Sequence, residues 1–64
     1  MTRLPTATEA IAYVIRTEAS WGIATQIRSV DQEKCADDGY IQVLTVANDW
    51  AVWVQPDGSL YGEC

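Results

Sequence analysis

The sequence contains no histidine, and it has four basic residues against nine acidic ones. Without histidine, a serine or cysteine nucleophile lacks its usual proton acceptor, and no serine or cysteine stands beside another recognisable base. A chain of 64 residues also has little room to enclose a substrate pocket. We therefore expect a protein that is not an enzyme and uses no cofactor.

Lysine and arginine are scarce, and the net charge is -5. Nucleic-acid affinity depends on lysine and arginine side chains that neutralise phosphates. The composition therefore argues against direct binding of nucleic acid.

The two cysteines, Cys35 and Cys64, are too few for a disulfide-rich secreted scaffold. They lack the CxxC spacing of a redox pair and the four ligands of a structural zinc site. The expected strand order places them at opposite ends of the sheet, so we expect both thiols to be free.

Long apolar runs are also missing, because the longest extends only from Ala10 to Ile15. A membrane-spanning helix needs roughly 20 apolar residues. The first residues lack the apolar centre of a signal peptide. We expect a cytosolic protein with no membrane partner.

The first regular element is a helix from Thr6 to Ala19, because apolar residues recur there at spacings of three and four. Thr6 and Glu9 fit a capping box. Gly22 can take the left-handed conformation that ends many helices.

Beyond Gly22 apolar and polar residues alternate with a period of two, which is typical of strands. The polar stretch Asp31–Gly39 is expected to be a loop, Asn48-Asp49 a tight turn, and Pro56-Asp57-Gly58 a hairpin turn. The four strands are expected at Ile23–Val30, Tyr40–Ala47, Trp50–Gln55 and Leu60–Cys64.

These elements predict one α+β domain over residues 1–64, with a single N-terminal helix packed on a four-stranded antiparallel sheet in chain order. The expected register pairs Thr45 with Val52, Val43 with Val54, and Trp53 with Tyr61. The helix should cover the continuous apolar face of the sheet, and Trp50 is expected on this face. The predicted core residues of that face are Ile41, Val43, Val52, Val54 and Leu60.

The connectivity gathers acidic residues at one end of the sheet. The expected acidic pole consists of Asp31, Glu33, Asp37, Asp38 and Asp57. Three interpretations stay open: the carboxylates solvate turns, they hold calcium, or they imitate a nucleic-acid backbone and bind a basic groove on a partner protein. Calcium is the least supported of these, because the spacing is not that of an EF-hand loop.

The other face of the sheet offers an alternative site. One helix cannot cover both faces, so an aromatic and apolar patch should point outward. Its expected residues are Tyr40, Leu44, Trp53 and Tyr61. Since tryptophan and tyrosine are common in binding hot spots, this patch indicates a small adaptor domain that docks a protein partner.

In length, acidity and single α+β domain, and in lacking catalytic residues, the chain resembles the small acidic anti-CRISPR proteins of bacteriophages that mimic DNA. The residues that carry the resemblance are Asp31, Glu33, Asp37, Asp38 and Asp57. The resemblance implies a non-enzymatic inhibitor in the host cytosol. It would bind a CRISPR effector complex and block recognition of target DNA at the protospacer-adjacent motif.

Overall fold

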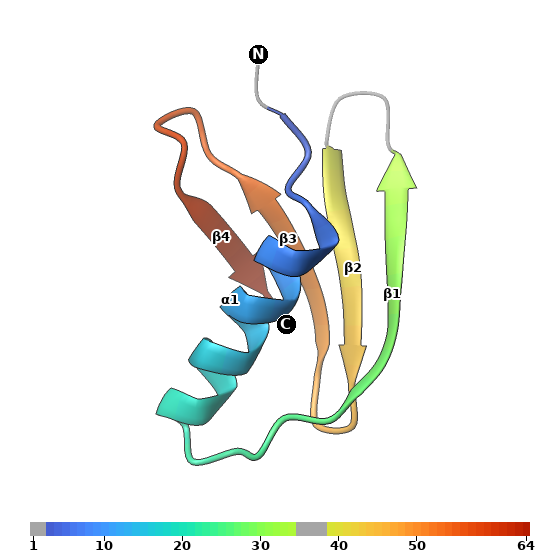
Figure 1. Ribbon diagram of the computed structural model, residues 1–64, viewed down its shortest axis with the longest axis vertical. Coiled ribbons are helices and arrows are strands. Elements are labelled where there is room, and N and C mark those ends of the chain that lie inside the picture. The colour runs from blue at the N-terminus through green and yellow to red at the C-terminus, as the bar shows by residue number, and fades with distance from the viewer. Residues whose placement is uncertain (1–2, 35–38) are drawn as a thin grey trace.

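The computed structural model describes residues 3–34 and 39–64, and for residues 32–34 the backbone alone. One helix and four strands follow in the order α1 (Ala7–Ser20), β1 (Ile27–Lys34), β2 (Gly39–Thr45), β3 (Asp49–Val54) and β4 (Leu60–Glu63). The strands form one antiparallel sheet in chain order, and α1 packs against β2, β3 and β4 on one face of it (Figure 1). The predicted α+β architecture is confirmed. In the part of the chain that the structure describes, no helix is long and apolar enough to cross a membrane.

Both ends of α1 form as the sequence predicts. The Thr6 hydroxyl accepts a hydrogen bond from the Glu9 amide at 3.1 Å, and the Glu9 carboxylate accepts one from the Thr6 amide at 3.0 Å. At the other end Gly22 has a φ of 80°, and the Ile23 amide donates to the Glu18 carbonyl at 2.9 Å. These bonds satisfy backbone groups that a helix leaves unpaired at its ends.

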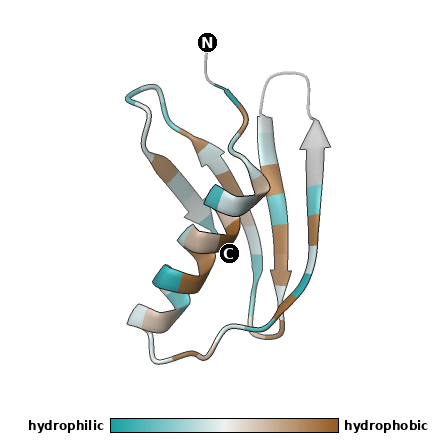
Figure 2. Cartoon of the chain, in the orientation of Figure 1, coloured by the Kyte–Doolittle hydropathy of each residue, from teal (hydrophilic) through white to brown (hydrophobic). Residues whose placement is uncertain are grey.

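The core lies between α1 and the sheet. Strand alternation buries every second residue of β2 from Ile41 to Thr45 and leaves the residues between them partly exposed. Figure 2 shows hydrophobic and hydrophilic segments following one another along the strands and the helix. The buried core cluster consists of Ala10, Val14, Ile41, Val43, Trp50 and Val52. The predicted assignment of the two sheet faces is therefore correct.

The predicted bounds of the first strand are wrong. The chain from Ile23 to Gln26 is a connection, and β1 begins at Ile27 and continues through Asp31 to Lys34, a stretch that we predicted to be a loop. A hydrogen bond from Thr25 to Glu18 at 2.8 Å holds the connection against the helix end. The later residues pair instead with β2, with Asp31 opposite Gln42.

The predicted register between β2 and β3 is also wrong, by four residues, because the turn lies two residues earlier in the chain than predicted. Val43 lies opposite Trp50, and Val52 lies opposite Ile41. The turn residues are Val46 and Ala47, because the Thr45 amide donates to the Asn48 carbonyl at 2.9 Å. The Thr45 hydroxyl also accepts a hydrogen bond from the Asn48 amide at 2.9 Å, which closes the turn at this pair.

The last hairpin matches its prediction. Trp53 lies opposite Tyr61, as expected. Gly58 has a φ of 90°, which a residue with a side chain rarely adopts, and its amide donates to the Gln55 carbonyl at 2.8 Å. The turn therefore sets the register between β3 and β4.

Two apolar residues in and just after the helix are more exposed to solvent than the sequence indicates. Ile15, an apolar residue of the predicted helix, has 45% of its surface exposed. Trp21 is also exposed, and it stacks on the buried Trp50 with ring centroids 5.5 Å apart. It therefore contacts the core from outside instead of filling it.

Alanine substitutions should destabilise the protein more in the core than at its margin. We expect Val52→Ala to lower the free energy of unfolding by on the order of 1 to 3 kcal/mol, because Val52 is fully buried. Ile15→Ala should cost less than about 1 kcal/mol, since Ile15 is largely exposed. Urea unfolding of both variants measures the difference. A larger loss for Ile15→Ala would contradict the burial of Val52 and the exposure of Ile15.

Candidate functional site

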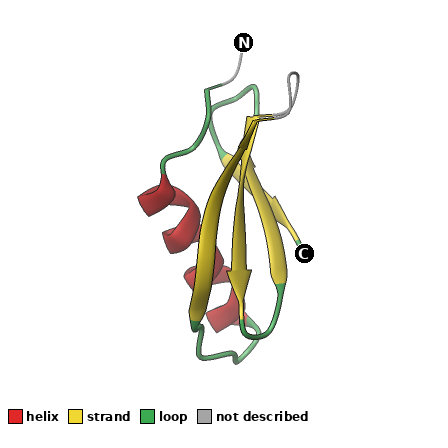
Figure 3. Cartoon of the chain, turned by 90° about the vertical axis from the view of Figure 1, so that its right-hand side faces the viewer, coloured by secondary structure: helices red, strands yellow, loops and turns green. Residues whose placement is uncertain are grey.

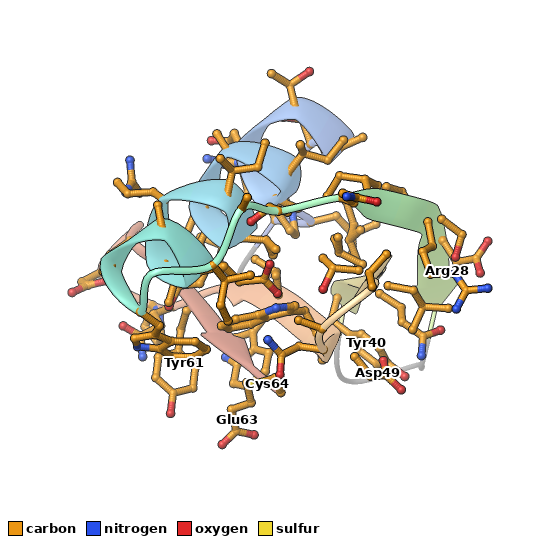
Figure 4. The ribbon with its side chains drawn as sticks, turned by 90° about the horizontal axis from the view of Figure 1, so that it is seen from below. Arg28, Tyr40, Asp49, Tyr61, Glu63 and Cys64 are labelled. Carbon is orange, nitrogen blue, oxygen red and sulfur yellow. The ribbon has the colours of Figure 1, made fainter. Side chains whose placement is uncertain are left out.

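The sheet has one face that α1 leaves open, which we call the outer face (Figure 3). Strand pairing arranges its described positions in three rows that run across the strands. The first row is Tyr40, Trp53 and Tyr61, the second is Asp31, Gln42, Ala51 and Glu63, and the third is Ser29, Leu44 and Asp49. Tyr40, Asp49, Tyr61 and Glu63 lie on the side of the sheet away from the helix (Figure 4).

An aromatic row crosses three strands of the outer face. Tyr40 of β2 lies opposite Trp53 of β3, which lies opposite Tyr61 of β4. The rings of Trp53 and Tyr61 meet edge to face, with centroids 4.9 Å apart and planes at 61°. Tyr61 keeps 39% of its surface exposed. The predicted aromatic patch therefore exists as a row of three rings.

Leu44 does not belong to that row. The predicted register placed it opposite Trp53, whereas it lies opposite Asp49 and Ser29, at the other end of β2 from Tyr40. The four-residue shift in register separates Leu44 from the rings.

Three carboxylates lie on the same face of the sheet as the rings. All three are exposed: Asp31 of β1, Asp49 of β3 and Glu63 of β4. Asp49 accepts a hydrogen bond from the side-chain amide of Gln42 at 3.1 Å. None of the described positions in the three rows is a lysine or arginine. Arg28 lies at the edge of the sheet, at the irregularity in the pairing of β1 (Figure 4). The rows themselves therefore carry acidic charge that no basic residue among them offsets.

Ala51 lies at the centre of this arrangement. Along β3 its neighbours on the same face are Trp53 on one side and Asp49 on the other. Across the strands it lies opposite Gln42 of β2 and Glu63 of β4. The smallest side chain of the outer face is thus surrounded by an indole, an amide and two carboxylates.

A shallow pocket of about 530 Å³ opens beside Asp49, at the turn between β2 and β3. Leu44 and Val46 supply apolar walls, and Arg28 lies at its margin. The pocket borders the third row, so the outer face is hollowed at this end.

The predicted acidic pole forms only in part. The start of α1, the end of β1 and the turn between β3 and β4 do lie at the same end of the molecule (Figure 1). Asp31, however, is in the middle of β1, opposite Gln42. Glu33 occupies the β1 position opposite Tyr40, but its side chain, like the whole of Asp37 and Asp38, lies outside the described residues.

Two acids at that end are bound by their own neighbours. The Asp57 carboxylate accepts hydrogen bonds from the amide and hydroxyl of Ser59, at 2.9 and 2.7 Å, and these bonds lower the pKa of Asp57. Arg3 holds Glu9 in a two-pronged ion pair at 2.8 and 2.9 Å. Together with the Thr6 amide, Arg3 lowers the pKa of Glu9 to about 2. Both carboxylates stabilise local structure.

Sequence reasoning missed the most buried acid. Glu18 was not among the predicted core residues, yet its side chain is fully buried. It accepts four hydrogen bonds of 2.8 to 2.9 Å, from Thr25, Thr45, Asn48 and the Trp50 indole. A usable signal was its helical position, since Ala10, Val14 and Glu18 follow one another at a spacing of four.

Burial alone would raise the pKa of Glu18. Hydrogen bonds from Asn48, Trp50, Thr45 and Thr25 outweigh this effect and lower the pKa to about 2. The group is therefore a buried carboxylate anion held by neutral donors. Its partners connect the helix end to the β2–β3 turn, so we interpret it as a structural anchor.

Metal and thiol chemistry find little support in residues 3–34 and 39–64. No group of three or more potential metal ligands is present among them. The calcium interpretation used four acidic residues. Asp31 lies in β1, whereas the side chain of Glu33 and the whole of Asp37 and Asp38 lie outside the described residues. Cys64 is exposed and forms no disulfide, whereas Cys35 lies outside the described residues.

Comparison with known proteins identifies no relative: no family model, curated protein or solved structure matches the chain.

Proposed function

We propose that the protein is a non-enzymatic inhibitor or regulator that binds a basic, nucleic-acid-binding surface of a partner protein. The outer face is the binding surface in this proposal. The supporting observation is that the aromatic row and the carboxylates of Asp31, Asp49 and Glu63 share this open face. Aromatic rings supply contact area, and carboxylates attract lysine and arginine.

The anti-CRISPR hypothesis is one form of this proposal. A CRISPR effector complex holds its nucleic acids in positively charged channels. A protein with a net charge of -5 and an acidic, aromatic face has the complementary charge. Asp37 and Asp38, in the segment of sequence between β1 and β2, would add to the same negative charge.

The adaptor hypothesis uses the same face but a different driving force. If the rings of Trp53 and Tyr61 dominate binding, the partner surface is apolar and the carboxylates only maintain solubility. Salt distinguishes the two hypotheses. Charge-driven binding weakens steeply as ionic strength rises, whereas ring-driven binding changes little.

Competition with DNA tests the proposal. Purified CRISPR effector complexes are incubated with labelled target DNA and increasing amounts of the protein, and DNA binding is followed by gel shift at low and moderate salt. We expect at least one complex to release its DNA, and to do so more readily at low salt. Undiminished DNA binding by every complex at saturating protein would reject competition with DNA.

A further inference from the structure

We propose that the outer face recognises an arginine side chain of the partner, seated over Ala51 between Trp53, Asp49 and Glu63. We call this site the arginine seat. The inference rests on the proposed function and deepens it, because it names the partner group that the face selects.

The geometry of the four residues carries the inference. Successive residues on one face of a strand are about 6.8 Å apart, and neighbouring strands are about 4.8 Å apart. Asp49 and Glu63 therefore lie on two adjacent sides of Ala51, and Trp53 lies on a third. Ala51 itself contributes only a methyl group between these three side chains.

Arginine matches this seat better than lysine. A guanidinium is planar, so it stacks on an indole while its five N–H groups donate to carboxylates at its edge. Two carboxylates on adjacent sides of Ala51 suit that fork. An ammonium is a compact and strongly hydrated point charge, and it gains less from the ring and from the second carboxylate.

Charge excludes other occupants. Nucleic acid and anionic lipid would both be repelled by Asp31, Asp49 and Glu63. A second copy of this chain also carries a net charge of -5, so association of two copies is opposed by repulsion. A basic segment of another protein is the occupant with complementary charge.

The test compares two labelled peptides of equal length and charge, one alternating arginine with serine and the other lysine with serine. Fluorescence anisotropy measures their binding to the full chain at low salt. We expect the arginine peptide to bind about threefold to tenfold more tightly. Ala51→Val fills the space above Ala51 with a residue that suits a strand, and it should reduce this preference to nearly one. Trp53→Leu should do the same by removing the indole, and urea unfolding confirms that each variant is folded.

The outcomes distinguish failure of the arginine seat from failure of the proposed binding to basic surfaces. If both peptides bind equally and with the same salt dependence, the arginine seat is rejected while binding to basic surfaces stands. An unchanged arginine preference in folded Ala51→Val and Trp53→Leu also rejects the seat. If neither peptide binds, the proposed function itself fails. Sedimentation of the protein alone should show a monomer. If it shows an oligomer that Arg28→Gln dissociates, the arginine in the seat comes from a second copy of this chain and not from another protein.

Discussion

Glu18→Gln should destabilise the protein far more than the same change at an exposed glutamate. The carboxylate accepts hydrogen bonds from Thr25, Thr45, Asn48 and Trp50, and a glutamine amide would present two donors of its own to these groups. Buried donors left without acceptors cost on the order of 3 kcal/mol in total. A domain of this size has a total stability of roughly 3 to 10 kcal/mol, so the substitution should remove about a third or more of it. Urea unfolding at neutral pH measures the loss.

Glu63→Gln is the matched control, because it makes the same chemical change at an exposed position. It should change the stability by less than about 0.5 kcal/mol. Equal urea midpoints for Glu18→Gln and Glu63→Gln would show that the buried network contributes nothing.

The same pair of variants has a pH signature. The pKa of Glu18 is about 2 in the folded protein, below its ordinary value of 4.5, so its ionisation stabilises the fold fully above pH 4.5. That contribution is lost as the pH falls from about 4.5 to about 2. Stability of Glu18→Gln should therefore vary less with pH in this window than that of Glu63→Gln. Some acid sensitivity should remain in both, because the pKa of Glu9 is also about 2.

Reversal of charge on the outer face should abolish charge-driven binding. Asp49→Lys with Glu63→Lys changes the net charge from -5 to -1, because each reversal adds two units. Placing two like charges against a basic surface should cost about 2 kcal/mol or more, which is roughly a thirtyfold loss of affinity. Both positions are exposed, so the fold should persist. Anisotropy with the arginine peptide measures the loss directly.

The pair Asp37→Lys and Asp38→Lys makes the same change in net charge in the segment of sequence between β1 and β2. If the outer face is the binding site, this pair should weaken binding only modestly, through the long-range field. An equal loss from both pairs would mean that net charge alone drives binding. A larger loss from Asp37→Lys with Asp38→Lys would transfer the site to the acidic pole.

Local signals in the sequence were sufficient for the helix, the last turn and the faces of the sheet. The capping box at Thr6 and the glycine at 58 depend only on their immediate neighbours, and both formed as predicted. The face assignment survived an error of register, because side chains alternate with a period of two and the shift was by four residues, an even number. A shift of one residue would have exchanged the core and the outer face.

The errors arose where distant residues decide the local structure. Asp31–Lys34 has the composition of a loop, and its pairing with β2 extends the strand. The β2–β3 turn forms at Val46 and Ala47, because Glu18 receives hydrogen bonds from both Thr45 and Asn48. The arrangement around Ala51 depends on this register, so it was not predictable from the sequence.

The Glu18 network has a consequence for how the chain folds. Its hydrogen bonds to Thr45, Asn48 and Trp50 span 27, 30 and 32 residues of sequence. They form only when the helix end and the closed β2–β3 hairpin have met, so neither piece alone satisfies the carboxylate. Until then Glu18 stays hydrated, and burial of the helix against the sheet is opposed by the cost of removing that water. Docking and hairpin closure are thereby coupled, which favours a folding reaction without stable partly assembled states.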